Sequence, residues 1–399
     1  MRALDPSLLR MLSFLTRRQA WLSPPEIARA FRPDDRPVSA RTVFRWFSFL
    51  EEQLGLAYFP HPRMNRLGLA EVSVRIRGLR SPAVLSTVPW AYSFWVELGL
   101  DGRPFLTQDY WIPGAQLKAF RDYWATAEEL GLVQSAEILA SRNTHFLFSP
   151  FHEVVAAEGI AEFRSDVDNE YFANLLRTHL RESYEVCFGE RIAASPLVVP
   201  LVLEHLWRHS SSRHVWEAIR AKGEAHILKQ ARGSLAKALR KEGAALKELQ
   251  SQWDGLLRHF NEVFLQPVVF WPLGLLRNSV LLSCTVGPGS DERIVAFARE
   301  VSEKSVVTAV MPEVSGGSCR VWCNPPSDQQ AAVLRLVGEY HRASRPPVVS
   351  IVDLTATRKA TQPSFLGFDW QAFDVEGSSW RFETDDYMER LKGLRPEGR

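Results

Sequence analysis

The sequence predicts an α+β protein in which a basic helical segment precedes a segment of mixed strands and helices, and in which this order occurs twice. The chain has 399 residues, which is too long for one ordinary hydrophobic core. Apolar residues recur at helical spacing near the N-terminus and again over 168–264, whereas strand patterns begin near residues 69 and 278. Two tandem copies of a two-part protein are therefore expected.

Positive charge is concentrated in two separate parts of a chain whose net charge is only +2. Residues 1–80 contain 14 Lys and Arg against 7 Asp and Glu, and residues 205–260 contain 11 against 5. Two basic blocks suggest two contact surfaces for a polyanion, although each also fits a solvated helical face. The four cysteines fit a reducing cytoplasm, and no apolar run is long enough to span a membrane.

Three helices are expected in the first 54 residues. Residues 6–18 place leucines on one side and arginines on the other. Ser23, followed by two prolines, is typical of the start of a second helix. Ser39 caps a third helix, in which one buried stripe is predicted from Val43, Trp46, Phe47 and Leu50.

A two-stranded wing is predicted directly after the third helix, because LAYF and RLGLAEV can pair around PHPRMN. Three helices followed by a hairpin is the winged helix-turn-helix order. The outward side of the third helix and the wing then supply donors for base edges and phosphates. A helical domain that mediates only protein contacts is the alternative. The predicted DNA-binding residues here are Ser39, Arg41, Thr42, Arg45, Ser48, His61, Arg63, Asn65 and Arg66.

A strand, helix, strand, strand, helix, strand order is predicted for the segment that follows. Residues 69–77 alternate between apolar and polar, and two further strands over 91–112 are joined at Asp101-Gly102. A longer helix over 114–131 and a strand over 132–141 complete the unit. This βαββαβ order is that of the ferredoxin-like fold. Its tryptophans are predicted in the core or between sheets, with an aromatic pocket for a planar effector as the alternative: Trp90, Trp95, Trp111 and Trp124.

The second half repeats this arrangement with a longer helical part. The helical part of each half is called its head. In the second head, residues 210–223 and 234–250 are each a candidate for the helix that contacts DNA bases, or else this head has lost a recognition helix and is degenerate. A second βαββαβ pattern begins with NSVLLSCTV at 278–286. Both halves run from a helix end through prolines and Leu-Gly-Leu into their first strand, which indicates a duplication of about 200 residues. The candidate DNA-binding residues of the second head are Arg213, His214, Lys237, Arg240 and Lys241.

The predicted architecture is therefore two winged helix-turn-helix-like domains that alternate with two ferredoxin-like domains. The expected boundaries are 1–67 for the first head, 68–142 for the first ferredoxin-like domain, 143–167 for a linker with little pattern, 168–272 for the second head, 273–357 for the second ferredoxin-like domain and 358–399 for a tail.

The order of these elements resembles the Lrp/AsnC, or feast/famine, transcription regulators. The resemblance lies in SARTVFRWFSFLEEQLGL as a recognition helix and NRLGLAEVSVRIRG as the start of an effector domain. It implies that the ferredoxin-like domains dimerise through their sheets and often sense amino acids or other small metabolites. The glycine-rich loop usual between the second and third strands is reduced to Leu100-Asp101-Gly102 and Gly316-Gly317, so no ligand residues are carried over.

An enzymatic alternative exists on the same fold. The siroheme decarboxylases resemble Lrp proteins without binding DNA, but their Arg-Arg-Phe-Gly stretch is replaced here by Leu-Ala-Tyr-Phe-Pro. A protein-interaction module is the other alternative. His205 and His209 lie one helical turn apart without a third metal ligand, and Cys319 and Cys323 are predicted as buried thiols. No cofactor and no metal are expected.

The sequence thus favours a cytoplasmic, non-enzymatic, sequence-specific DNA-binding transcriptional regulator. Double-stranded DNA is the expected partner, and a small-molecule effector is an option that the resemblance leaves open. No membrane contact is expected. Apolar and polar residues alternate in the tail WQAFDVEGSSWRF, as in an additional β-strand. Such a strand could pair with the exposed edge of a sheet in a second chain, which favours a homodimer.

Overall fold

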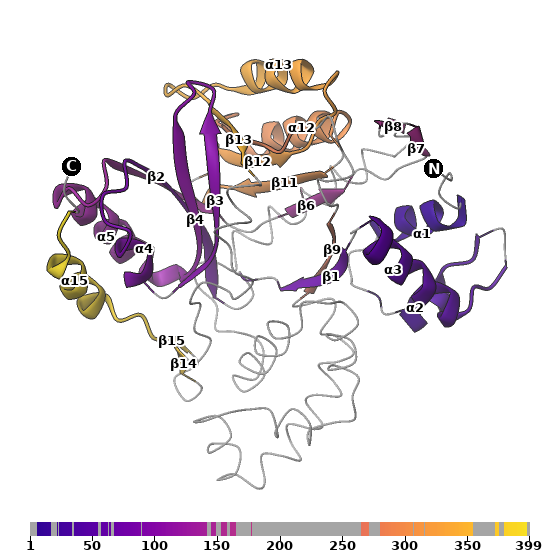
Figure 1. Ribbon diagram of the computed structural model, residues 1–399, viewed down its shortest axis with the longest axis horizontal. Coiled ribbons are helices and arrows are strands. Elements are labelled where there is room, and N and C mark those ends of the chain that lie inside the picture. Colours follow the sequence, from indigo (N-terminus) through magenta and orange to yellow (C-terminus); the bar gives the residue numbers. More distant parts are fainter. Residues whose placement is uncertain are drawn as a thin grey trace, which may run out of the picture.

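The computed structural model confirms the α+β class, with helices packed on a main sheet of nine strands (Figure 1). The structure describes residues 6–16, 22, 24–33, 36–54, 57–62, 64, 68–88, 90–141, 145–148, 153–157, 160–164, 177, 265–270, 280–305, 307–314, 316–353, 372–374 and 379–396. Every helix within these ranges is too short or too polar to cross a membrane.

The first three helices form what we call the N-terminal head, which consists of α1 (Pro6–Thr16), α2 (Pro24–Ala30) and α3 (Ala40–Leu54) (Figure 1). Its buried apolar side chains come from all three helices: Leu8, Met11, Leu15, Ile27, Val43 and Leu50. Phe31, directly after α2, contacts Phe14 of α1 and Trp46 of α3 through their rings. The three predicted helices are therefore confirmed, and of the predicted stripe on α3 Val43 and Leu50 are buried.

The predicted wing is wrong, because the strand after α3 pairs elsewhere. Strand β1 (Ala57–Pro62) runs antiparallel to β9 (Leu265–Phe270), with Pro60 opposite Pro267. It cannot pair with β2 (Leu69–Arg77), since β4 (Pro104–Pro113) and β5 (Ser135–Ser141) already occupy both edges of β2. Proline lacks an N–H, so a separate two-stranded sheet, which has only edge strands, accommodates these prolines.

The first sheet unit spans residues 69–141 and contains the elements expected from the sequence. Their order is β2, α4 (Val84–Thr87), β3 (Ala91–Gly99), β4, α5 (Leu117–Glu129) and β5, with a short 3-10 turn η3 (Gly114–Gln116) before α5. The four strands are antiparallel and lie in the order β5-β2-β4-β3. Alternate residues of β2 face the helices, where Val72, Val74 and Ile76 are fully buried.

The second sheet unit spans residues 282–352 and has the same element order. It consists of β10 (Leu282–Val286), α12 (Asp291–Ser302), β11 (Val307–Pro312), β12 (Cys319–Cys323), α13 (Gln330–Tyr340) and β13 (Val348–Val352). Its strands lie in the order β13-β10-β12-β11, so each strand occupies the position of its counterpart in the first unit. Ser290 caps α12 by accepting a hydrogen bond from the Arg293 N–H.

The two units join at both edges. Strand β3 pairs with β13, where Ile351 lies opposite Leu98. At the other edge, Ser141 of β5 bridges to Glu313, and the Val314 N–H donates to the Ala140 carbonyl at 2.8 Å. The first junction joins the second strand of the first unit to the fourth strand of the second, and at the other junction the fourth strand of the first unit meets the two residues that directly follow β11, the second strand of the second unit. The two four-stranded sheets thus close into a ring, and their inner faces oppose each other.

The remaining described elements lie in the segments predicted as a linker and a tail. The linker segment contains three strands: β6 (His145–Phe148), which pairs with β11, and β7 (Glu153–Ala157) and β8 (Ile160–Arg164), which pair with each other. In the tail, β14 (Phe373–Asp374) and β15 (Ser379–Trp380) pair with each other rather than with an edge of the main sheet. Helix α15 (Thr384–Gly393) follows and packs against α4 and α5.

Candidate functional site

Helix α3 presents a basic outer face. Arg41, Arg45 and Ser48 are exposed, whereas Val43 and Leu50 are fully buried on the opposite side. Trp46 and Phe47, predicted in the buried stripe, are half-buried at the boundary between the two sides. The sequence-predicted donors of α3 are therefore brought together on one accessible surface.

Two of the predicted contact residues also begin the helix. The Ser39 Oγ accepts a hydrogen bond from the Thr42 N–H at 3.1 Å, and the two hydroxyl oxygens lie 2.9 Å apart. This is the geometry of a serine N-cap, which satisfies an N–H that the first helical turn leaves without a partner. Ser39 and Thr42 therefore determine where α3 begins and how Arg41 is presented.

The described side chains of the head, within residues 6–50, carry mostly positive charge. Among the side chains described between residues 6 and 50, six arginines are exposed and Glu26 is the one acidic residue. The six arginines are Arg10, Arg29, Arg32, Arg36, Arg41 and Arg45. Exposed guanidinium groups bind phosphates and carboxylates through planar pairs of N–H donors. This surface is thus suited to a polyanion.

The other predicted contact residues cannot be placed in the same surface. His61 lies in β1 opposite Gln266, and its side chain is not described. The remaining positions lie outside the described residues: Arg63, Asn65, Arg66, Arg213, His214, Lys237, Arg240 and Lys241. His205 and His209 lie outside them too. The DNA-binding role of all these residues stays a prediction.

Sequence reasoning missed two phenylalanines on the outer face of α3. Phe44 is 38% exposed and Phe49 is 42% exposed. Both lie at helical spacing from Arg41, Arg45 and Ser48, so helical periodicity was a signal that could have found them. We use "outer face of α3" for Arg41, Phe44, Arg45, Ser48 and Phe49.

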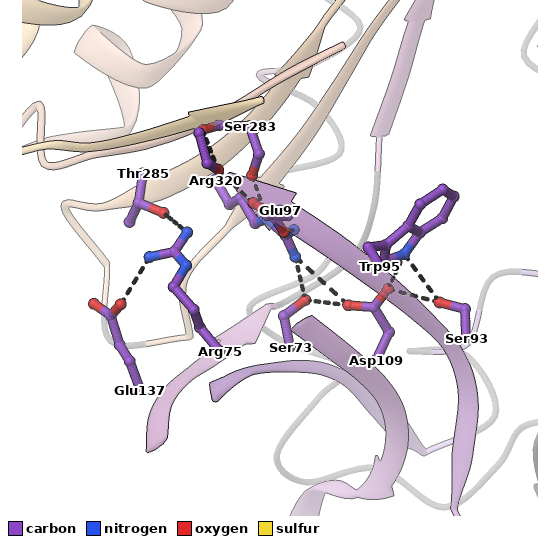
Figure 2. Close-up of polar contacts among 11 residues, drawn as sticks. Ser73, Arg75, Ser93, Trp95, Glu97, Asp109, Glu137, Ser283, Thr285 and Arg320 are labelled. Carbon is purple, nitrogen blue, oxygen red and sulfur yellow. Dashed lines mark hydrogen bonds and ion pairs between the residues drawn. The ribbon is translucent and has the colours of Figure 1, made fainter. Parts of the chain in front are cut away.

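A second polar site lies between the inner faces of the two sheets (Figure 2). Arg320 of β12 points from the second unit into the first. Its Nη2 donates to Glu97 Oε1 at 2.6 Å, its Nη1 donates to Ser73 Oγ at 2.8 Å, and its Nε donates to Ser283 Oγ at 3.0 Å. The guanidinium also lies 4.8 Å from the ring centre of Trp322. Both Arg320 and Glu97 are almost completely buried.

Asp109 and Arg75 extend this cluster on either side of Arg320 (Figure 2). Asp109 accepts hydrogen bonds from Ser73, Ser93 and Trp95 at 2.6–2.7 Å, and its Oδ1 lies 3.5 Å from Arg320 Nη1. The Arg75 guanidinium donates to Glu137 at 2.7 Å and to Thr285 of the second unit at 3.0 Å. We call Arg75, Glu97, Asp109 and Arg320 the inter-sheet charge cluster.

The electrostatics of this cluster favour a structural role. Burial by itself would raise the pKa of Glu97, but Arg320, Arg75 and a hydrogen bond from Ser350 together hold that pKa below its ordinary value. Burial and the charge of Arg320 lower the pKa of Arg75. The two guanidinium groups pair with carboxylates and hydroxyls, and among their nitrogens only the Arg75 Nε is buried without a hydrogen-bond partner. Because the charges are paired across the two sheets, the cluster links the two units.

The lowered pKa of Glu97 predicts a loss of stability in acid. A carboxyl group whose pKa is lower in the folded state stabilises the protein above the pKa of the unfolded chain, about 4.3, and loses this effect as the pH falls through the folded-state pKa. The parent protein should therefore lose more free energy of unfolding between neutral pH and acid than Glu97→Gln, as measured by urea denaturation. Equal pH dependence in both proteins would contradict this.

The cysteines behave as expected from the sequence. Cys284, Cys319 and Cys323 are buried on the helix-facing side of the second sheet. Burial raises the pKa of the Cys319 thiol, and a hydrogen bond with Cys284 together with burial raises the pKa of the Cys323 thiol. Raised pKa values keep thiols protonated and unreactive. Within the described ranges, no group of three or more His, Cys, Asp or Glu side chains is arranged to hold a metal ion.

Comparisons with known proteins give a distant structural likeness. No family model and no curated protein matches the chain. The crystal structure of the siroheme decarboxylase NirDL is similar with a TM-score of 0.43 and 9% identity, covering 97% of each chain. NirDL in co-complex with an iron-uroporphyrin III analogue gives a TM-score of 0.39 and 8% identity, covering 86% of this chain and 90% of that chain. Likenesses this distant assign no activity to this chain.

Proposed function

We propose that this chain is a DNA-binding transcriptional regulator of the Lrp/AsnC type, which reads double-stranded DNA with the N-terminal head. The observation that carries the proposal is the outer face of α3, where Arg41 and Arg45 project one turn apart from a helix anchored by Val43 and Leu50. A helix fits the major groove, and arginine is the side chain best suited to the two acceptors of guanine. The proposal assigns no catalytic step to the chain.

The surrounding arginines supply the second part of such an interface. Arg29, Arg32 and Arg36 are exposed on α2 and in the segment that connects it to α3. Contacts from such residues to phosphates fix the position of a recognition helix without reading sequence. Because they displace counterions, binding should weaken steeply as the salt concentration rises.

The two sheet units support an assembly function within this proposal. We interpret them as two ferredoxin-like domains of one duplicated chain, because they share strand order and meet through equivalent edges. A regulator with a single ferredoxin-like domain needs two chains to pair two such sheets. In this proposal one chain contains both domains and pairs their sheets by itself. The homodimer, the small-molecule effector and the cytoplasmic location stay predictions, and light scattering at micromolar concentration tests the first of them.

A selection experiment followed by a binding assay tests the proposed function. Duplexes with a randomised centre are enriched on the full-length protein, and binding of the best duplex is followed by fluorescence anisotropy. With about four phosphate contacts, affinity should fall roughly 100-fold between about 50 and 200 mM salt. Failure to enrich any duplex, with no binding at the lowest salt, would exclude DNA as the partner.

Single arginine substitutions locate the interface. Arg45→Ala should weaken binding to the selected duplex roughly ten- to hundred-fold, because a bidentate contact to guanine is lost. Arg335→Ala, at an exposed position on α13, is the matched control and should bind as the parent does. Circular dichroism should show both variants folded. If Arg45→Ala and Arg335→Ala bind equally well, α3 is not the reading helix.

A further inference from the structure

The two phenylalanines on the outer face of α3 are among the exposed large apolar side chains rather than the buried core. Six large apolar side chains are exposed among the described residues, and Phe44 and Phe49 are the two aromatic ones. The other four are Leu98, Leu100, Leu130 and Leu334, which lie in the two sheet units. The core side of α3 is supplied by Val43 and Leu50, which are fully buried.

Their spacing places the phenylalanines within the arginine surface rather than beside it. Phe44 precedes Arg45 and follows Arg41 by three residues, while Phe49 lies four residues after Arg45. Residues three and four apart are neighbours on a helix, so cationic and apolar side chains alternate along one continuous strip. The strip from Arg41 to Phe49 is about 12 Å long, because an α-helix rises 1.5 Å per residue. This length corresponds to roughly three to four base pairs of DNA.

We propose that the outer face of α3 reads the 5-methyl groups of thymine in the major groove, between guanine or phosphate contacts made by Arg41 and Arg45. This inference deepens the proposed function and rests on it. In the major groove the thymine methyl is the apolar feature that distinguishes base pairs, and phenylalanine is one of the side chains that contact it. The preferred site therefore contains thymine within about three base pairs of an arginine-contacted guanine.

The positive charge of the surface argues for DNA over an apolar protein partner. An apolar groove that received Phe44 and Phe49 would also have to accommodate Arg41 and Arg45 on either side of Phe44. DNA offers both partners at once, since thymine methyl groups line a groove bounded by phosphates. A protein partner would need acidic residues beside an apolar pocket, and it becomes an outcome of the test below.

Replacing thymine by deoxyuridine tests the inference, because it removes the methyl group and leaves every hydrogen-bonding group in place. The duplex selected from the randomised pool is synthesised with thymine, and again with deoxyuridine at one position at a time. For the parent protein, one or two positions should bind about three- to fivefold more weakly, as expected for loss of one buried methyl group. Loss at no position, in a duplex that binds tightly, would overturn the inference while leaving the proposed function standing.

Variants of the two phenylalanines connect that loss to α3. Phe44→Ala should bind the thymine duplex more weakly and should no longer distinguish one of the deoxyuridine duplexes from it. Phe49→Ala should do the same at a different position. Leu334→Ala is the matched control, since Leu334 is also 38% exposed but lies on α13, and it should distinguish the duplexes as the parent does.

Three outcomes separate the possibilities. Discrimination that disappears in Phe44→Ala or Phe49→Ala and persists in Leu334→Ala supports the inference. Discrimination that persists in both phenylalanine variants overturns it, because another part of the chain would then contact the methyl groups. If the protein binds no duplex at all, the proposed function fails first, and the strip is better explained as a contact surface for an acidic protein.

Discussion

Arg320→Ala is expected to lower the free energy of unfolding by about 3–5 kcal/mol, which is the usual cost of removing one partner of a buried ion pair. The arginine connects Glu97, Ser73 and Ser283 across the two sheets, and its removal leaves Glu97 buried without its closest cation. Urea denaturation followed by tryptophan fluorescence and by circular dichroism measures the loss.

A control variant and a double-mutant cycle separate the effect of the charge from that of the packing. Arg335→Ala, on the exposed side of α13, should change the stability by no more than about 0.5 kcal/mol. In a double-mutant cycle, Glu97→Gln should restore part of the stability lost in Arg320→Met, because the uncompensated carboxylate is removed; a coupling of about 0.5–3 kcal/mol is expected. Additive effects would mean that Arg320 stabilises the protein through packing against Trp322 instead.

The buried charges also explain why the two units pair with each other. Among the described residues the first unit contributes three buried carboxylates, Glu71, Glu97 and Asp109, together with Arg75. The second unit contributes Arg320 as its only buried charge within those residues. Two copies of the first unit would bring buried carboxylates together, which costs free energy, so the distribution favours pairing between unlike units. Specific pairing of this kind suits a duplicated chain.

Local patterns in the sequence were sufficient to predict most helices and strands of the sheet units. Leu69–Arg77 alternates between residues facing the helices and residues facing the opposing sheet, and α3 begins at its predicted serine cap. Those signals arise within a few residues of each other. The partner of β1 was missed because β9 lies in the other half of the chain, and strand pairing at that separation leaves no local signal.

The inter-sheet charge cluster was missed for the same reason. Ser73 and Glu97 lie 247 and 223 positions away from Arg320 in the sequence. From the local sequence, each of these residues is predicted to be a polar side chain on the solvent-facing side of a strand. Only closure of the two sheets into a ring buries them together, and that closure depends on register at two distant junctions. The arginines of α3, in contrast, were found because one helix holds them all.

The tail adds a helix, α15, to the first sheet unit, in which the helix α4 is short. The first helix of the first unit, α4, has four residues, whereas its counterpart α12 has 12. Helix α15 packs against α4 and α5, and its Tyr387 and Leu391 are buried in the core of the first unit. The tail therefore covers apolar surface that a longer α4 would otherwise cover.

Trp90→Ala is expected to lower the free energy of unfolding by about 3–5 kcal/mol and to loosen the tail. The Trp90 indole is almost completely buried, donates to the Tyr387 hydroxyl at 3.2 Å, and lies 5.8 Å from the Trp380 ring and 5.7 Å from the Phe382 ring. Because these three partners all belong to the tail, limited proteolysis should cleave the variant between β13 and α15 faster than it cleaves the parent. Leu130→Ala, which changes an exposed side chain at the end of α5, should leave both stability and cleavage unchanged. A Trp90→Ala protein that loses stability without faster cleavage would show that Trp90 stabilises the sheet unit without holding the tail in place.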